Sequence, residues 1–169
     1  NYWKNKLSGE IPVLDLPKDF PPPAQPSYKG AFNVRPLSDD LSKAVLSLST
    51  ELETTPYVLL LSAYFVLLHR YSGQSDILIG SPISNRDQKA LESLIGFFND
   101  TVVLRSQLNS EMSFRDLVKM VRKITMEAFA NKDAPFDVLV KELKPQRSLS
   151  INPFFQVMFL YHPVPPAPD

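Results

Sequence analysis

The stretch Ile95–Thr101, with the sequence Ile-Gly-Phe-Phe-Asn-Asp-Thr, marks the point where a helical pattern gives way to an extended one. Two later stretches have a similar make-up: Asn131–Asp137 (Asn-Lys-Asp-Ala-Pro-Phe-Asp) and Arg147–Phe154 (Arg-Ser-Leu-Ser-Ile-Asn-Pro-Phe). Each combines glycine or proline with aromatic residues and a few polar groups. Because glycine and proline punctuate local structure, all three stretches are expected at junctions between helices and strands.

The patterns on either side of these stretches alternate between helical and extended periodicity, which predicts an α/β fold. The run Ile77–Ile79 is short and wholly apolar, as in a strand covered on both faces. Ser38 and Ser113 are expected to cap helices, with Asp116 as the capping-box partner of Ser113. Helices are predicted at 39–52, 56–71, 87–94, 113–129 and 135–143, and extended segments or strands at 28–35, 76–83, 98–108 and 154–161.

Prolines crowd two segments of the chain, 17–36 and 163–168. Since proline lacks an amide donor and fixes φ, both segments are expected to be extended connectors. We therefore assign residues 1–27 to a linker laid along a surface, 28–162 to a folded lobe that is incomplete, and 163–169 to a Pro-rich exit segment.

The composition argues against several classes of function. The 169 residues are 44% hydrophobic and include 18 basic and 18 acidic side chains, so the formal net charge is zero. A neutral chain argues against a large nucleic-acid or anionic-membrane footprint, and neither partner is expected. The chain has no cysteine, so disulfides and thiolate chemistry are excluded. With no secretory segment and no apolar run long enough to span a bilayer, a cytoplasmic piece of a larger protein is expected.

Metal chemistry is not expected from the two histidines, His69 and His162, which are far apart in the sequence. Without cysteine they form no metal-binding spacing, and no directly bound cofactor is expected. His69 lies near the end of a predicted buried helix, where it is expected to interact with backbone carbonyls. His162 is expected to be solvated at the end of a strand.

Asp100 has two open interpretations. If Phe98–Leu104 is a regular strand, Asp100 shares a face with apolar neighbours and needs a specific partner or a polar cleft. Alternatively, Asn99-Asp100 forms a bulge or turn at the entrance of the strand. Periodicity favours neither interpretation.

The acids near Pro135 favour structural roles. Asp133 is expected to cap the helix that begins at Pro135, and capping is favoured over catalysis. Arg147 is expected to form a structural ion pair with one of three acids, Asp133, Asp137 or Glu142.

Taken together, in this order and spacing, the three stretches resemble the later signature motifs of the condensation domain of nonribosomal peptide synthetases. His69–Asp76, Ile79–Arg86 and Asn152–Phe159 also resemble stretches of this family, so the likeness covers nearly the whole chain. The motif or structural positions that carry it are Gly96, Phe97, Phe98, Asp133, Pro135, Phe136, Asp137, Arg147, Asn152 and Pro153.

The resemblance implies an α/β two-layer sandwich, similar to chloramphenicol acetyltransferase, that forms the C-terminal lobe of a two-lobed domain. Residues 1–27 would then join the lobes, and the active site would be a tunnel between them, with Asn99, Asp100 and Thr101 as candidates to line it. In the implied reaction an acceptor amine attacks a donor thioester, and phosphopantetheine arms deliver both substrates. The implied partners are the N-terminal lobe, the upstream and downstream peptidyl carrier proteins and an adjacent adenylation domain.

The chain also departs from the family pattern. The catalytic His-His-x-x-x-Asp-Gly motif does not occur in it. The resemblance places that motif in the other lobe, so no catalytic residue is assigned here and the chain alone is expected to be inactive. Asp100 stands where the family usually has asparagine. Two alternatives remain open: an epimerisation or heterocyclisation domain of the same fold, and a non-catalytic lobe that serves as a scaffold or docks carrier proteins.

Overall fold

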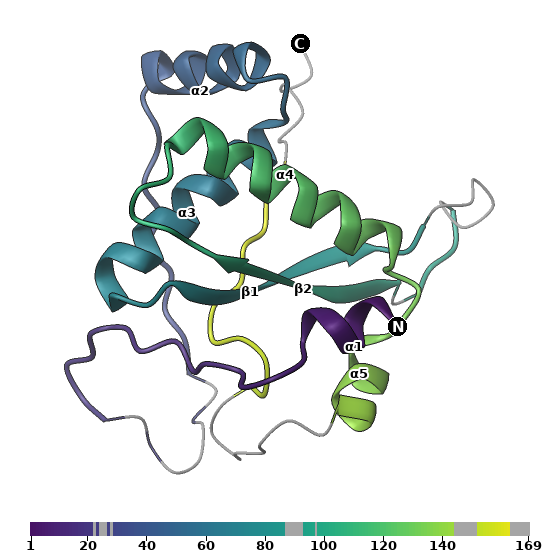
Figure 1. Ribbon diagram of the computed structural model, residues 1–169. Helices are drawn as coiled ribbons and strands as arrows, with labels where there is room; N and C mark the ends of the chain where they lie inside the picture. The colour runs from purple at the N-terminus through teal and green to yellow at the C-terminus, as the bar shows by residue number, and fades with distance from the viewer. Residues whose placement is uncertain are drawn as a thin grey trace.

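Two antiparallel strands form the centre of the computed structural model, which describes residues 1–21, 23, 27, 29–86, 93–96, 98–143 and 152–162 (Figure 1). Strand β1 (Asp76–Ser84) pairs with β2 (Asn99–Gln107), and Ile79 lies opposite Leu104 in the register. Both strands are buried at their centres, as the apolar run in β1 predicts.

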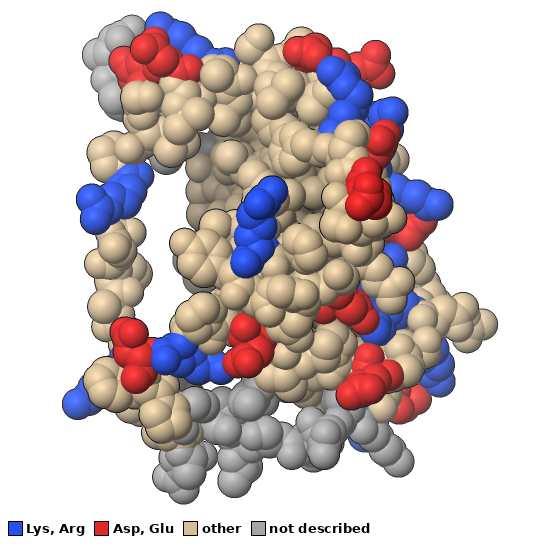
Figure 2. Space-filling view, turned by 60° about the vertical axis from the view of Figure 1, so that its left-hand side comes forward, with Lys and Arg blue, Asp and Glu red and all other residues tan. Residues whose placement is uncertain are grey.

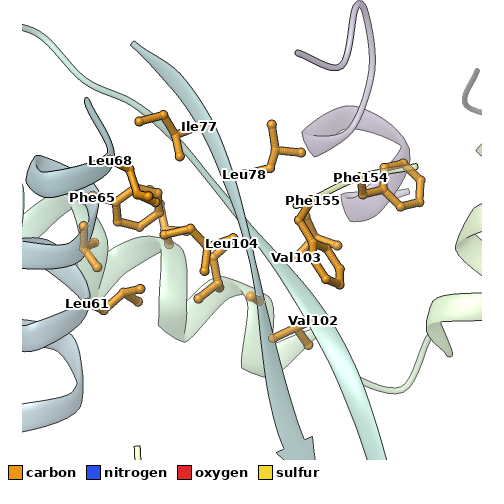
Figure 3. Close-up of a cluster of buried hydrophobic side chains, with 14 of the residues drawn as sticks. Leu61, Phe65, Leu68, Ile77, Leu78, Val102, Val103, Leu104, Phe154 and Phe155 are labelled. Carbon is orange, nitrogen blue, oxygen red and sulfur yellow. The ribbon is translucent and has the colours of Figure 1, made fainter. Parts of the chain in front are cut away.

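Two long helices cover one face of this sheet (Figure 1). Helix α3 (Pro56–Ser72) packs against α4 (Phe114–Ala130), and α4 lies along β2. On this side Leu61 and Phe65 of α3 meet Leu104, and all three side chains are fully buried (Figure 3). Burial of apolar surface of this kind contributes about 1.5–3 kcal/mol for each large side chain.

Local sequence signals start and end these helices. Helix α2 (Asp39–Glu51) and α4 begin after Ser38 and Ser113, whose hydroxyls accept hydrogen bonds from the amides of the first turn, so both predicted N-caps are confirmed. Helix α3 begins after Thr55 in the same way and ends at Gly73, which has φ of 71°. Glycine suits that left-handed position because it has no Cβ to clash.

The second face of the sheet is covered by short elements and by the C-terminal segment. Helix α1 (Tyr2–Lys6) and α5 (Phe136–Leu143) lie on this side (Figure 1). The Phe155 ring lies directly over Gly80, where a Cβ atom would come within 2.5 Å of it. Gly80 is therefore required for close packing, not for a turn.

Residues 1–16, which we call the N-terminal strap, are held closely along the lobe and are not a plain extended connector. Residues 2–6 form a helix that the proline-based prediction missed, because α1 precedes the prolines and is anchored by Trp3, which is buried. Further along the strap, Leu14 N donates to Gln156 Oε1 at 2.6 Å and Asp15 N donates to Gln74 Oε1 at 2.7 Å. These bonds join positions far apart in sequence, which local patterns do not encode.

The predicted strand at 154–161 is wrong in its extent. The structure has a single parallel bridge between Gly80 and Met158, in which Gly80 N donates to Val157 O and Phe159 N donates to Gly80 O. Phe154 and Phe155 instead bend toward the core, because the Asn152 side chain holds their amides in a turn. The segment follows β1 but does not extend into a regular ladder.

Other segments complete the comparison with the predicted elements. Residues 29–38, which include most of the extended segment predicted at 28–35, form no regular element and stand away from the body (Figure 2). Residues 87–92 of the predicted helix at 87–94, and the exit segment 163–169, lie outside the described residues. Lysines, arginines and acids are interspersed on the face in Figure 2, in keeping with the zero net charge. Within the described part of the chain, no single helix is long and apolar enough to cross a membrane; α2 and α3 pass that test only as a pair bent by 104°.

Candidate functional site

Parts of all three signature stretches meet at the end of the sheet where β1 finishes and β2 begins. Asp100, the second residue of β2, accepts a hydrogen bond from the Phe136 amide at 3.4 Å. Phe136 opens α5, and its ring contacts those of Phe154 and Phe155 at centroid distances of 5.8 and 5.6 Å. We call these four residues, with Asn152, the motif cluster. Its bond between Asp100 and Phe136 joins positions 36 residues apart in sequence.

Asn152 shapes the third part of the cluster. Its Oδ1 accepts hydrogen bonds from Phe154 N at 3.0 Å and from Phe155 N at 3.3 Å. Pro153 between them removes one amide that would otherwise need a partner. This turn places the buried Phe154 and Phe155 against Phe136. Figure 3 shows both rings on the opposite side of the strands from Leu61 and Phe65. Asn152 and Pro153 therefore have structural roles in the cluster.

The structure decides between the two interpretations of Asp100. The register is unbroken, with Asp100 opposite Ile83 and Asn99 opposite Ser84, so this part of the strand contains no bulge. Asp100 is half-buried, and its Oδ1 accepts from the amides of Thr101 at 2.7 Å and Phe136 at 3.4 Å. The interpretation as a strand residue with a specific partner is confirmed.

The carboxylate of Asp100 keeps unused acceptor capacity. Its Oδ2 accepts no hydrogen bond, and it forms no ion pair, with any residue that the structure describes. A carboxylate can accept about four hydrogen bonds, and burial without them is costly. Asp100 can therefore bind an N–H, O–H or cationic group of another molecule or another part of the domain. Its neighbours Asn99, which is exposed, and Thr101, which is half-buried, lie on either side of it.

The start of the first stretch is held by Arg86. The Arg86 guanidinium lies 4.2 Å from the centroid of the Phe98 ring and donates to Leu94 O at 2.8 Å and Gly96 O at 3.4 Å. Cation–π contact of this kind adds about 0.5–1 kcal/mol at exposed sites. Gly96 and Phe98 are thus scaffold for the entrance of β2, while Phe97 lies outside the described residues.

The prediction that Asp133 caps α5 is wrong. Asp133 is exposed, and the carboxylate that meets the first amide of α5 belongs to Asp100. Helix α5 begins at Phe136, one residue later than predicted, and its first amide bonds to Asp100 of β2. Asp137 is exposed in the first turn of α5, where an acid suits the positive end of the helix dipole. Pro135 is exposed just before the helix, and Arg147, with its predicted ion pair, lies outside the described residues.

Among the residues that the structure describes, neither histidine forms a hydrogen bond with a residue of the motif cluster. His69 Nδ1 bonds to Gln74 O at 2.8 Å, which confirms the predicted interaction with a backbone carbonyl. His162 is exposed at the end of the described C-terminal segment.

Sequence reasoning missed a pair of hydroxyls close to the bridge between Gly80 and Met158. Tyr57 OH and Ser81 Oγ are 2.7 Å apart, and Ser81 donates to Phe159 O at 3.1 Å, so Tyr57 is the donor to Ser81. Burial raises the pKa of Tyr57, which keeps the phenol protonated and able to donate. The signal for Ser81 was its place in a buried strand, where a polar residue needs a partner.

Comparisons with known proteins agree with the family resemblance seen in the sequence, over nearly all of the chain. A family model described as "Condensation domain" matches residues 1–166. A linear gramicidin synthase of Brevibacillus parabrevis is 48% identical over 164 residues, which cover 97% of this chain and 2% of that protein. Gramicidin S synthase 2 of Brevibacillus brevis is 44% identical over 163 residues, which cover 94% of this chain and 4% of that protein.

Two solved structures have a similar fold. A holo four-domain nonribosomal peptide synthetase, bound to AMP and glycine, has a TM-score of 0.92 at 27% identity, covering 95% of this chain and 12% of that one. The X-domain from teicoplanin biosynthesis has a TM-score of 0.85 at 29% identity, covering 93% of this chain and 35% of that one. The chain therefore spans only a small part of the proteins it resembles.

Proposed function

This chain belongs to the condensation-domain family, and we propose that it forms one wall of an amide-bond-forming site in a nonribosomal peptide synthetase. The predicted α/β lobe is confirmed by its structural neighbours. We assign residues 1–27 to the connection from an upstream lobe and 28–162 to the lobe itself, with 163–169 leading onward.

In the proposed reaction, the nitrogen of an acceptor amine attacks the carbonyl carbon of a donor thioester. The new C–N bond replaces the C–S bond, the thiol leaves, and the amine gives up a proton. Carrier proteins upstream and downstream would present both substrates on phosphopantetheine arms, and an adenylation domain would load them. We place this assembly in the cytoplasm.

Asp100 carries the proposal for this chain. It is the half-buried carboxylate with spare acceptor capacity at the point where the signature stretches meet. Its Oδ2 could accept a hydrogen bond from the acceptor amine or from a group of the opposite lobe, and so hold the amine in line with the thioester. Correct placement of reacting groups contributes large rate factors, because it replaces a bimolecular encounter. The chemical base would come from the upstream lobe, since the His-His-x-x-x-Asp-Gly motif is absent here.

The first test is Asp100→Ala in the intact domain, assayed with loaded carrier proteins. We expect the condensation rate to fall by about tenfold or more, a loss in proportion to that of other positioning groups. Asp100→Asn separates charge from shape, and Asp40→Ala on the exposed surface of α2 is the matched control. Equal product formation by Asp100→Ala and the wild type would refute the role of Asp100.

A second test uses the chain by itself. We expect no dipeptide when the chain is mixed with loaded carriers, because the proposed base lies in the upstream lobe. Product formation should return when the intact domain is used under the same conditions. Dipeptide formation by the chain alone would contradict the proposal that the upstream lobe supplies the base.

The second candidate function is docking without catalysis. One structural neighbour with a TM-score of 0.85 is a complex of the X-domain and OxyB from teicoplanin biosynthesis, so that similar fold is seen bound to another protein. A docking lobe would retain partner binding and show no condensation in the intact domain. Measuring product formation and carrier binding on the same preparation separates the two functions.

A further inference from the structure

The guanidinium of Arg105 is fully occupied by bonds between the sheet and the N-terminal strap. Its Nε and Nη2 donate to the two carboxylate oxygens of Asp76 at 2.9 and 2.6 Å. Nη1 donates to the carbonyls of Lys6 at 3.3 Å and Ser8 at 3.0 Å, and Nη2 donates to Glu10 O at 3.0 Å. Arginine has five N–H donors, and each of the five finds an acceptor here.

Arg105 thus hydrogen-bonds to the backbone of the strap at the end of α1 and just after it. The three carbonyls come from residues 95 to 99 positions away in sequence, and they lie on both sides of Gly9, whose φ is 76°. The Arg105 side chain is only 12% exposed, and bonding to Asp76 raises its pKa. A cation in this setting is costly to leave unpaired, so Asp76 is needed to keep it in place.

The strap leads from Arg105 back toward the motif cluster. Trp3, one turn earlier in α1, donates its indole N–H to Asn131 O at 2.7 Å. Asn131 ends α4 and opens the stretch that leads to Phe136, whose amide meets Asp100. Figure 1 shows α1 and α5 on the same side of the sheet, and Lys4 Nζ lies 3.6 Å from Glu142 Oε2 near the end of α5. Helix α1 therefore contacts both the stretch that leads to Phe136 and helix α5 itself, through Trp3 to Asn131 and Lys4 to Glu142.

We propose that Arg105 is a positioning residue for condensation: with Asp76 it fixes the strap, and the strap sets where the upstream lobe sits over Asp100. This inference rests on the proposed function, because it concerns how the two lobes of one reaction site are placed. Arg105 touches no substrate in this proposal. It acts through the carbonyls of Lys6, Ser8 and Glu10.

Arginine is required here by geometry and not by charge alone. Lysine has three donors on a single nitrogen and cannot bond the two oxygens of Asp76 and three separate carbonyls together. Arg105→Lys should therefore loosen the strap while keeping the charge that Asp76 needs. This makes it the informative variant, and Arg105→Gln the more severe one.

The experiment uses the intact domain, with a spin label on Lys119→Cys of α4 and a second label on the upstream lobe. The Lys119 side chain is 72% exposed, so the label should not disturb the core. Pulsed electron resonance gives the distribution of distances between the lobes, hydrogen exchange reports the strap amides, and steady-state assays give kcat and KM. Arg115→Gln, which breaks the exposed pair with Glu51, is the matched control.

We expect Arg105→Lys to speed exchange of amides 1–10, broaden the distance distribution and lower kcat about tenfold, with a smaller change in KM for the loaded carriers. Arg115→Gln should change none of these. If Arg105→Gln does not fold, Arg105→Lys decides alone.

An unchanged distance distribution with a loosened strap would overturn the inference, whatever happens to the rate. If the wild-type domain forms no amide bond, the proposed function fails, while the distances still test the role of Arg105. A slower rate with unchanged distances and unchanged exchange would also count against it.

Discussion

Asp76 and Asp100 lie at opposite ends of the same antiparallel sheet, and their carboxylates are used in different ways. Asp76 receives two short bonds from Arg105. Asp100 receives two backbone amide bonds on one oxygen, one of them long, and its other oxygen is free of described partners. An acid with both carboxylate oxygens bonded to a largely buried cation has a structural role. An acid with spare acceptors at a junction of motifs is available for another molecule.

The largest effect is expected from Asp76→Asn. The change leaves Arg105 as a poorly compensated cation, and breaking a buried pair costs about 3–5 kcal/mol. Because the Asp76 side chain is 28% exposed, we expect a smaller loss, about 2–3 kcal/mol of unfolding free energy. Urea denaturation with an unchanged m-value measures it. If Asp76→Asn lowered the free energy of unfolding by no more than the loss of an exposed ion pair, about 0–1 kcal/mol, Asp76 would not be more structural than Asp100.

A smaller loss is expected from Gly80→Ala, between the two ends of the sheet. The added methyl group would lie 2.5–2.8 Å from three atoms of the Phe155 ring, so the ring must move. Overpacking of this kind costs about 1–3 kcal/mol. In a double-mutant cycle, Phe155→Leu should recover part of the loss, because the shorter side chain vacates the space. Simple additivity of the two losses would show that Phe155 is not the obstacle.

Ser113→Ala removes the N-cap of α4, which is distinct from the Asp76 and Asp100 contacts. The substitution should lower the free energy of unfolding by about 1 kcal/mol. The Ser113 hydroxyl donates to Asp116 Oδ2 at 2.6 Å and lowers the pKa of that exposed carboxyl. A lowered pKa adds stability above the ordinary pKa of aspartate, and this stability is lost as the pH falls through the lowered value. Thermal melts at about pH 7 and about pH 3 should therefore differ less in Ser113→Ala than in the wild type. Identical pH dependence would contradict the effect of the Ser113 hydroxyl on the Asp116 carboxyl.

The smallest effect on stability is expected from Asp100→Asn. Asparagine keeps an oxygen that can accept the amides of Thr101 and Phe136, so the unfolding free energy should change by less than about 1 kcal/mol. The same substitution should still slow condensation in the intact domain. A stability loss as large as that of Asp76→Asn would show that both acids are structural, and the comparison would fail.

Much of the fold followed from local patterns. The caps at Ser38 and Ser113, the apolar run of β1 and the glycine that ends α3 are signals contained within a few residues. The failures concern segments whose conformation depends on distant contacts. Helix α1 is anchored by the bond from Trp3 to Asn131, 128 residues away, and the segment after Asn152 bends because its aromatic rings enter the core.

The sequence predicted which residues belong to the candidate site, but not which of them bond to one another. Asp100 was a candidate from sequence because it departs from the usual family residue and because an acid among apolar neighbours needs partners. Its bond to Phe136 could not be foreseen, since the prediction gave the capping role to the nearer Asp133. Sequence proximity was a poor guide because α5 is oriented by packing of Phe136 on Phe154 and Phe155, which leaves its first amide facing β2.

The sequence by itself determined most of the helices, the two strands, the resemblance to the family and the absence of the histidine motif, because each depends on local periodicity or on residue identity. Only the tertiary structure decided which polar groups are filled and which are free. Every residue has a backbone carbonyl, so the sequence does not indicate which carbonyls Arg105 will bond. Its bonds to Lys6, Ser8 and Glu10 are therefore visible only in the structure. The division between a structural Asp76 and an available Asp100 arises from those long-range bonds.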